Sequence, residues 1–501
     1  MTDLLRFLKQ RLPTTAPMVG VAEGPILCLS ELDRRTSALA TELSERAINC
    51  LALDADNGPA WLVADLACQR ARIPLLPLPG FFSDSQKCHA MTATGADALI
   101  SDRTCTASRW GRTIFPVDDN AMVLTYLPTG QRANDRLPPG TGKITFTSGS
   151  TGTPKGVCLS NGQLLHQAAT LALAAGQDSP RHLCLLPLPM LLENVAGAYT
   201  AMVAGGQAIV PALDRLGFNG STLVDPGALL RAIDTAAPQT MILVPRLLEV
   251  LVSACEQGWS PPESLRFVAV GGSRVPPAQI HRARTHGIPV YEGYGLSECA
   301  SVVSLNTPAN DRPGTAGKPL PHLTVTFDRG ELTVAGNPFL GYVGEPRSWG
   351  QETVATGDLG EMEDGFLVLR GRRKNLLVSS YGRNISPEWV ESEILAGPAI
   401  ADCIVFGDAR PWPVALVQAA PGATDHDINR WLAHCNRTLP DYARVHRWQH
   451  LPSPLADVPG ALTANGRPRR EAITRYYRRI LDDLYAEGTT LPAHACKETL
   501  D

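Results

Sequence analysis

The chain has 501 residues, of which 44% are hydrophobic, and this predicts a folded protein of two or more domains rather than a disordered one. A formal net charge of −4 gives no general attraction to nucleic acid or to anionic lipid, so we expect no nucleic-acid partner. Twelve cysteines are scattered singly without zinc-type Cys/His spacing, so we expect reduced thiols. The sequence shows neither a signal-peptide pattern nor an apolar run of about 18 residues, so we expect a cytoplasmic location and no integral membrane association.

The first part of the chain alternates short apolar runs with helical patterns. Leucines and a phenylalanine within residues 4–8 recur at helical spacing, which favours a first helix packed on the core over one that touches a membrane. Strands are predicted at 48–53 and 98–101, with a helix at 60–70 between them. This alternation is typical of a mainly parallel sheet covered by helices.

The alternation continues to about residue 300. The predicted strands are 182–188, 207–211, 240–244 and 265–270, and the predicted helices lie around Leu164 and at 245–256. Residues 320–370 differ, because short alternating strands joined by Arg-Gly and Asp-Gly turns are typical of an antiparallel element. These strands are expected at 324–327, 331–334 and 366–369.

From about residue 373 the pattern predicts a small α+β unit. Its helices are expected at 387–396, 425–437 and 471–487, and its strands at 401–406 and 414–419. The predicted fold class is therefore α/β, with a large N-terminal domain of βα-layered, mainly parallel sheets, a small antiparallel β element and a small α+β C-terminal domain. We predict domains at 1–372 and 373–487, followed by a tail at 488–501.

Residues 144–157 (ITFTSGSTGTPKGV) form the strongest motif, in which a β-type run enters a loop of hydroxyls, glycines and one lysine. Glycines let the backbone approach an anion, and Lys155 adds a compact positive charge. A polar surface loop is the alternative. The sequence does not fit a P-loop, because Gly156 follows the lysine. The expected polyphosphate contacts are Thr147, Ser148, Gly149, Ser150, Thr151 and Gly152.

A second motif, VYEGYGLSE, occupies residues 290–298. A predicted strand ends in Tyr294, whose ring can lie flat against a purine, and Ser297 can donate to a phosphate oxygen. Glu298 can hold Mg²⁺ through one carboxylate. The alternative is a helix cap made by Ser297. The nucleotide-binding residues expected in this motif are Glu292, Gly293, Tyr294, Gly295 and Ser297.

Two further clusters fit a nucleotide. Asp358 follows a predicted tight turn and can accept from two ribose hydroxyls, although an Asp beside Gly is more often part of an Asx turn. A predicted strand ends at Gly272 and Ser273, which fits backbone contact with the edge of adenine. Any strand-to-helix turn can have this sequence, so Gly272 and Ser273 are only supporting evidence for a nucleotide site.

Together these ordered motifs resemble the acyl-adenylate-forming superfamily, which includes acyl-CoA synthetases, firefly luciferase and the adenylation domains of peptide synthetases. The resemblance covers roughly residues 20–475. It implies that residues 144–157 bind phosphate, that the 290–298 motif binds adenine and magnesium, and that Asp358 and Arg372 bracket the ribose. It also implies an interdomain hinge at Lys374.

Several segments, including 186–194 and 374–391, resemble long-chain acyl-CoA synthetases. In the substrate pocket that this implies, Met190 replaces a usual histidine and Glu193 matches the family carboxylate. Glu193 can be a structural, salt-bridged residue or can bind a substrate ammonium group. Near the C-terminus, Arg467 replaces the usual catalytic lysine, with Arg470 three residues on. Arginine keeps the charge but is planar and bulkier, so the exchange is not conservative.

The resemblance implies an ATP-dependent acid–thiol ligase that activates a carboxylic acid, fatty or otherwise apolar, as acyl-AMP. Its implied cofactors are ATP, Mg²⁺ and CoA, or the phosphopantetheine of an acyl carrier protein. The implied catalytic residues are Lys155, Glu298 and Arg467, with Glu298 holding the metal. Two alternatives stay open: an acyl- or amino-acyl-AMP ligase that loads a carrier protein, and a degenerate nucleotide-binding homologue without ligase activity.

Overall fold

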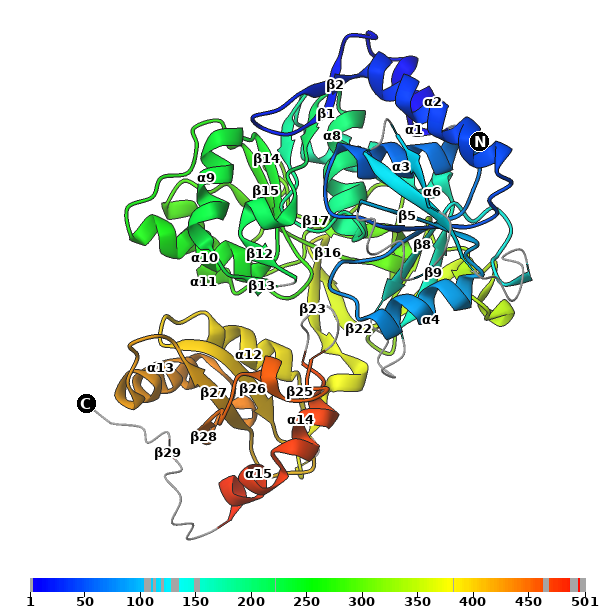
Figure 1. The fold of residues 1–501 in the computed structure, drawn as a ribbon. Coiled ribbons are helices and arrows are strands. Elements are labelled where there is room, and N and C mark those ends of the chain that lie inside the picture. Colours follow the sequence, from blue (N-terminus) through cyan, green and yellow to red (C-terminus); the bar gives the residue numbers. More distant parts are fainter. Residues whose placement is uncertain are drawn as a thin grey trace. The chain divides into compact units, whose positions relative to one another are not determined.

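Figure 1 shows the computed structural model of the chain. The structure describes residues 3–102, 110, 114–118, 121–127, 135–147, 154–220, 222–381, 383–462, 468–486 and 494–495. The chain forms two compact units. Unit 1 comprises Met1–Ser273, His281–Thr326 and Thr333–Ala355, and unit 2 comprises Arg274–Ile280, Phe327–Leu332 and Thr356–Asp501. These discontinuous units differ from the continuous domains predicted at 1–372 and 373–487, and that domain division stays a prediction.

Unit 1 contains a nine-stranded sheet with the order β18-β17-β16-β15-β14-β10-β11-β1-β2 (Figure 1). The strands from β16 to β1 run parallel to their neighbours, while β17, β18 and β2 are antiparallel at the two edges. The bounds are β1 Pro17–Gly20, β2 Ile26–Cys28, β10 Arg181–Leu183, β11 Gln207–Ile209, β14 Thr240–Leu243, β15 Phe267–Val270, β16 Val290–Leu296, β17 Ser301–Leu305 and β18 Lys318–Pro319.

A second, eight-stranded sheet has the order β21-β9-β8-β4-β3-β5-β7-β6. Its centre from β8 to β5 is parallel, and both ends are antiparallel. The predicted α/β class with parallel sheet centres is therefore confirmed. The bounds are β3 Leu51–Asp54, β4 Leu75–Pro77, β5 Ala98–Ser101, β6 Ile114–Val117, β7 Met122–Tyr126, β8 Lys143–Thr147, β9 Lys155–Leu159 and β21 Gly341–Tyr342.

Helices connect these strands, as the alternating sequence pattern predicts. The helix predicted at 245–256 is α10, which starts with Pro245 in its first turn and buries Leu247, Leu248 and Leu251 on one face. Among the described residues between 4 and 285, the other α-helices are α1 Leu4–Lys9, α2 Leu29–Glu45, α3 Pro59–Ala71, α4 Asp84–Thr94, α6 Asn161–Ala175, α7 Leu191–Glu193, α8 Thr200–Val203, α9 Pro226–Ala236 and α11 Pro277–Thr285.

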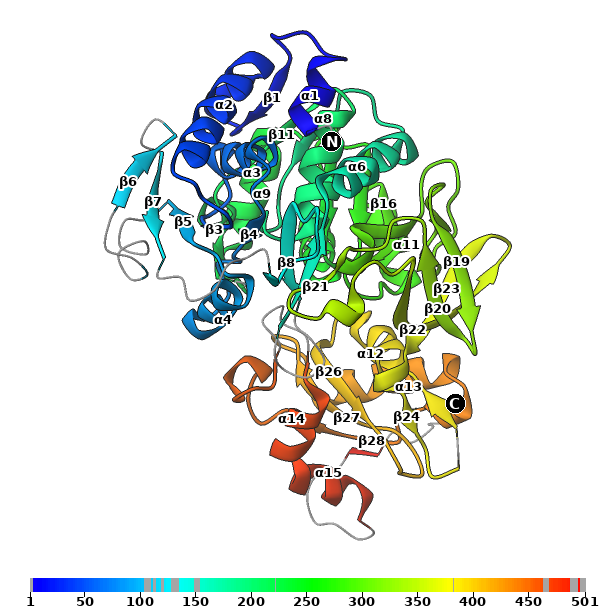
Figure 2. The same ribbon diagram turned by 90° about the vertical axis from the view of Figure 1, so that its right-hand side faces the viewer.

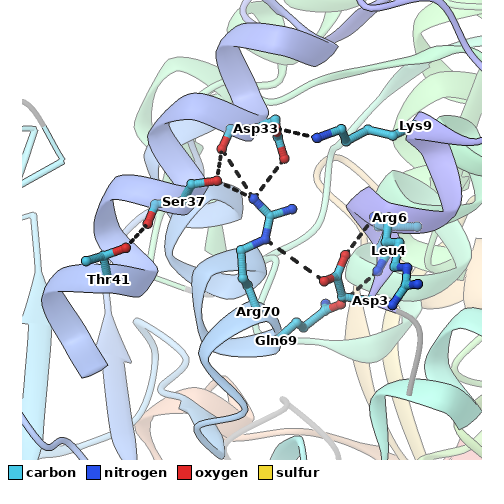
Figure 3. Close-up of polar contacts among 9 residues, drawn as sticks. All are labelled: Asp3, Leu4, Arg6, Lys9, Asp33, Ser37, Thr41, Gln69 and Arg70. Atoms are coloured by element: carbon cyan, nitrogen blue, oxygen red, sulfur yellow. Dashed lines mark hydrogen bonds and ion pairs between the residues drawn. The ribbon is translucent and has the colours of Figure 1, made fainter. Parts of the chain in front are cut away.

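Helix α1 packs on the core of unit 1, and its last residue, Lys9, forms an ion pair with Asp33 of α2. Its leucines Leu4, Leu5 and Leu8 are buried, which confirms the expectation of a packed first helix. Figure 3 shows Asp33 between Lys9 and Arg70, with both ion-pair distances at 2.8 Å. Among the described residues, no helix is long and apolar enough to cross a membrane.

A fully buried ion pair lies deeper in unit 1. Lys143, the first residue of β8, donates to Asp65 of α3 at 2.9 Å. Tyr199 also donates to Asp65, at 2.5 Å, and Asn194 accepts a further hydrogen bond from the lysine. Burial lowers the pKa of Lys143, and the Asp65 carboxylate opposes that shift. The pair thus joins β8, α3 and the π-helix Asn194–Tyr199.

We predict that Lys143→Met lowers the free energy of unfolding by about 3–5 kcal/mol, because it leaves the buried Asp65 carboxylate without a positive charge to balance it. Lys9→Met is the matched control, since it also deletes one Lys–Asp pair, but at a site where the lysine side chain is 49% exposed. Its cost should be about 0–1 kcal/mol. Urea unfolding followed by circular dichroism measures both values, and equal costs would contradict the prediction.

Unit 2 is built on a four-stranded sheet with the order β26-β27-β28-β29, and Figure 2 labels the first three of these strands. Alternate residues of β26 and β27 enter two different apolar clusters, one with residues of α12 and α13 and the other with residues of α14 and α15. This explains the continuous apolar runs in both strands. The bounds are β26 Ile400–Phe406, β27 Val414–Ala419, β28 Arg447–His450, β29 His494–Ala495, α12 Pro387–Leu395, α13 Asp425–Thr438, α14 Arg470–Tyr476 and α15 Arg478–Tyr485.

The structure differs from the predicted elements in several places, and strand β28, for example, was not predicted. The single helix predicted at 471–487 is wrong, because the chain breaks at Tyr477 (φ −99°, ψ 21°) into α14 and α15, and no glycine or proline marks the break. An unpredicted strand, β22, forms another four-stranded sheet with three expected ones in the order β19-β20-β22-β23. Their bounds are β19 Thr324–Asp328, β20 Glu331–Ala335, β22 Thr353–Glu363 and β23 Phe366–Arg372.

Candidate active site

Strands β8 and β9 form a hairpin that frames the predicted phosphate loop. Thr147 and Lys155 are partners across this antiparallel pair, so Lys155 begins a strand instead of lying within the loop. Five expected phosphate contacts between them, namely Ser148, Gly149, Ser150, Thr151 and Gly152, lie outside the described residues. The hairpin nevertheless fixes both ends of the loop.

Glu298 follows the end of β16 in the 3₁₀ turn Ser297–Cys299. Close backbone packing fixes this turn, because a Cβ on Gly295 would lie 1.7 Å from the carbonyl oxygen of Ser301. Only glycine fits there. Tyr294 was expected at the end of the strand but lies within β16, opposite Ser304 of β17.

Lys155 and Glu298 converge on one tyrosine that the sequence reasoning missed. The Tyr342 hydroxyl donates to Oε1 of Glu298 at 2.9 Å, and Nζ of Lys155 lies 4.9 Å from the centre of the Tyr342 ring. Nζ of Lys155 also pairs with Oε1 of Glu345 at 2.9 Å. Burial, and then the Glu298 carboxylate, raise the pKa of Tyr342, so its hydroxyl remains a donor. No local pattern predicts this contact, because Tyr342 is far from both partners in the sequence.

Asp358 and Arg372 are also brought together, within unit 2. They are opposite partners in β22 and β23, and Nε of Arg372 donates to Oδ1 of Asp358 at 2.8 Å. The expectation that Asp358 follows a tight turn is therefore wrong, since it lies inside an 11-residue strand. Two residues after Arg372, the predicted hinge residue Lys374 is exposed in the 3₁₀ turn Arg373–Asn375.

The residues expected near adenine lie on neighbouring strands of unit 1. Glu292 of β16 is the partner of Val270, the last residue of β15. Gly272 and Ser273 follow β15 and are exposed. A Cβ on Gly271 would lie 2.9 Å from the carbonyl oxygen of Gly293, which shows how closely the two strand ends approach.

Glu193, at the end of α7, is fully buried and hydrogen-bonded inside unit 1. Its Oε1 lies 2.8 Å from Nε2 of His182, and its Oε2 accepts from the backbone amides of Leu185 and Leu186. These contacts end β10 after three residues, where a longer strand was predicted. They favour the structural alternative for Glu193. Met190 caps α7 and is half-buried.

Cys184 lies beside the same carboxylate. The ligand atoms of His182, Cys184 and Glu193 lie within 4.8 Å of one another, the one such group among the described residues. The carboxylate, however, is already occupied by the imidazole and two backbone amides. Hydrogen bonding therefore accounts for this cluster, and we assign no metal to it.

We predict that Glu193→Gln lowers the free energy of unfolding by about 1–3 kcal/mol, because the amide cannot accept from all the donors that surround the carboxylate. The KM for the carboxylic acid that the family resemblance implies should stay unchanged. Glu42→Gln, on the surface of α2, is the control and should unfold like the wild type. A raised KM for the acid at unchanged stability would instead support an ammonium-binding role.

Arg467, the residue at the usual lysine position, lies outside the described residues. Arg470, three positions on, has a structural role in unit 2. Its Nη2 donates to Oε2 of Glu391 at 2.6 Å, and its Nη1 donates to the carbonyl oxygen of Val405 at 2.8 Å. Glu391 in turn accepts from the Val405 amide at 2.7 Å, so the buried pair links α14, α12 and β26.

Two family profiles match the chain. The profile described as AMP-binding enzyme covers residues 15–338, and the profile described as AMP-binding enzyme C-terminal domain covers residues 374–489. The first match alone spans more than half of the chain. The protein therefore belongs to the acyl-adenylate-forming superfamily of AMP-binding enzymes, as its motifs predict.

Similar proteins carry more specific names. A 2-succinylbenzoate–CoA ligase from Bacillus velezensis is 31% identical over 325 residues, which cover 60% of this chain and 63% of that protein. A long-chain-fatty-acid–CoA ligase from Mycobacterium bovis is 25% identical over 431 residues, or 68% of this chain and 69% of that protein. This chain thus spans less than two thirds of the first relative's length.

The fold is shared with solved structures of the superfamily. The o-succinylbenzoate–CoA synthetase of Bacillus subtilis, in complex with its acyl-adenylate intermediate, superimposes with a TM-score of 0.76. The alignment covers 94% of this chain and 98% of that one at 22% identity. An anthranilate–CoA ligase in complex with anthranoyl-AMP gives a TM-score of 0.79 at 16% identity.

Proposed function

We propose that the protein is an ATP-dependent carboxylic acid–CoA ligase that works through an acyl-adenylate. The observation that carries this proposal is the convergence of Lys155 and Glu298 on Tyr342. A cation and a carboxylate that both contact one tyrosine suit the charged phosphates of a nucleotide and their accompanying Mg²⁺. Membership in the superfamily supplies the reaction class.

In the first step, a carboxylate oxygen of the acid attacks the α-phosphorus of ATP, and pyrophosphate leaves. The carboxylate is already a nucleophile, so no general base is required. Lys155 neutralises phosphate charge, and Glu298 offers the single carboxylate that Mg²⁺ commonly takes from a protein. The metal, when bound, spreads the negative charge that develops on the phosphates.

In the second step, the thiol of CoA attacks the carbonyl carbon of the mixed anhydride, and AMP leaves with the former carboxylate oxygen. We assign the ribose hydroxyls to Asp358, which Arg372 orients across the β22–β23 pair, and the purine face to Tyr294. Water must be excluded from the adenylate until the thiol arrives.

The acid is proposed to carry a large apolar body. The relatives described above are named for 2-succinylbenzoate and for long-chain fatty acids, so an aromatic acid is the first candidate and a fatty acid the second. Met190, apolar and flexible, suits either. All these relatives are CoA ligases, which favours CoA over a carrier protein as the acceptor.

Pyrophosphate exchange into ATP tests the proposal with a panel of aromatic and fatty acids. The proposal expects exchange with at least one acid, and expects CoA to accelerate AMP release from that adenylate. Exchange without any response to CoA would favour carrier-protein loading. ATP binding without exchange for any acid in the panel would favour the degenerate homologue.

We predict that Glu298→Ala slows adenylate formation by about a hundredfold or more, roughly 3 kcal/mol of lost charge stabilisation. The melting temperature should stay near that of the wild type, because Glu298 is only partly buried. Single-turnover formation of acyl-AMP measures the first effect and calorimetry the second. A fully active variant would rule out the magnesium role.

We also predict that Arg467→Ala abolishes adenylate formation but leaves CoA acylation from supplied acyl-AMP largely intact. Arg467→Lys distinguishes two cases. If the site is adapted to the planar guanidinium, this variant should be neutral or less active, whereas in a decayed lysine site it should raise the adenylation rate. Adenylation of Arg467→Ala at the wild-type rate would show that this cation is not used.

A further inference from the structure

We propose that Tyr342 is a positioning residue for Glu298: its hydroxyl occupies one carboxylate oxygen, so that a metal ion is taken by the other. This inference rests on the proposed function, because it assigns a role within the nucleotide site of unit 1. It goes further by naming a residue, from a segment remote in sequence, that controls the affinity of that site for its metal.

The backbone around Tyr342 is fixed from both sides. Strand β21 pairs with β9, with Tyr342 opposite Val157. The amide of Tyr342 donates to Oγ of Ser348, and its carbonyl oxygen accepts from the indole of Trp349, both at 2.8 Å. The ring also packs edge-on against Phe339 with 4.7 Å between ring centroids. The hydroxyl therefore has one well-defined position, as a positioning group requires.

Glu298 meets the same segment through its main chain. The amide of Phe339 donates to the carbonyl oxygen of Glu298 at 2.8 Å, three residues before Tyr342 donates to its side chain. Backbone and carboxylate are thus both held by one short stretch of chain. An oriented carboxylate with one oxygen occupied favours single-oxygen binding of a metal such as Mg²⁺, which keeps waters and phosphate oxygens as its other ligands.

The Tyr342 ring has a separate contact with Lys155, which makes a clean test possible. The lysine ammonium lies 4.9 Å from the ring centre and pairs with Glu345, at side-chain exposures of 43% and 47%. Such an exposed pair adds little to stability. Tyr342→Phe keeps the ring, its packing on Phe339 and its contact with Lys155, and removes only the hydroxyl that reaches Glu298.

The test measures Mn²⁺, as a probe of the Mg²⁺ site, by electron paramagnetic resonance in the presence of ATP. We expect Tyr342→Phe to raise the dissociation constant for Mn²⁺ about 10–100-fold, the usual effect of losing a group that orients a metal ligand. The Mg²⁺ concentration for half-maximal pyrophosphate exchange should rise in parallel. At saturating Mg²⁺ the KM for ATP should stay near the wild-type value.

Tyr485→Phe is the matched control, because it also loses one hydroxyl hydrogen bond, to the carbonyl oxygen of Trp412 at 3.0 Å in unit 2. It should bind Mn²⁺ like the wild type. All titrations are made below the melting temperature of each variant, so that a stability loss cannot imitate a loss of metal affinity.

The outcomes separate this inference from the proposed function. If Tyr342→Phe binds Mn²⁺ as the wild type does while Glu298→Ala does not, the positioning role is overturned and the metal role of Glu298 stands. Tighter binding by Tyr342→Phe also overturns it, because the hydroxyl would then compete with the metal. Unchanged binding in Glu298→Ala overturns the metal role itself.

Discussion

The antiparallel register of three neighbouring strands, β8, β9 and β21, determines the geometry of the candidate site. Thr147 pairs with Lys155, which closes the predicted phosphate loop, and Val157 pairs with Tyr342 on the other side of β9. Because side chains alternate across a strand, a shift of one residue in either pairing would turn Tyr342 or Lys155 to the opposite face. The contact between Tyr342 and Glu298 therefore depends on backbone hydrogen bonds that no short motif encodes.

Buried polar side chains hold several elements of unit 1 in place through hydrogen bonds and ion pairs. They also explain why a carboxylate that matches a family pattern can be mistaken for a substrate-binding residue. Glu193 sits in a segment that resembles a substrate pocket, yet its oxygens hold His182 and two backbone amides. Lys143 directly precedes the phosphate-loop motif, yet its ammonium group is ion-paired with Asp65. Both residues show that a charged side chain close to a functional motif can stabilise the surrounding fold instead of taking part in the chemistry.

The sequence predicts those features that depend on neighbouring residues better than those that depend on contacts between residues far apart in the chain. Local periodicity predicts α10 and β27 at their observed bounds, and motif resemblance predicts the family. The resemblance also groups Asp358 with Arg372 around a ribose, and the structure shows the two side chains hydrogen-bonded to each other. The strand that holds Asp358 was missed, because residues 353–363 contain glycine and mixed polar positions that imitate a loop. Tyr342 was missed for a different reason, because its proposed role depends on contacts with Glu298 and Lys155, which lie 44 and 187 positions away in the sequence.

The replacement of the usual lysine by Arg467 limits where adenylation can find its positive charge. Arg470, the other cation of the family pattern, is bound to Glu391 and to the Val405 carbonyl, and freeing it would leave the Glu391 carboxylate buried without a positive charge beside it. It cannot therefore serve the reaction without loosening α14 from α12 and β26. The guanidinium group of an arginine at position 467 has several donors in one plane and can bind a carboxylate and a phosphate oxygen at once. A lysine would contact both through a single compact ammonium group. An active enzyme of this sequence must accommodate that larger, planar group.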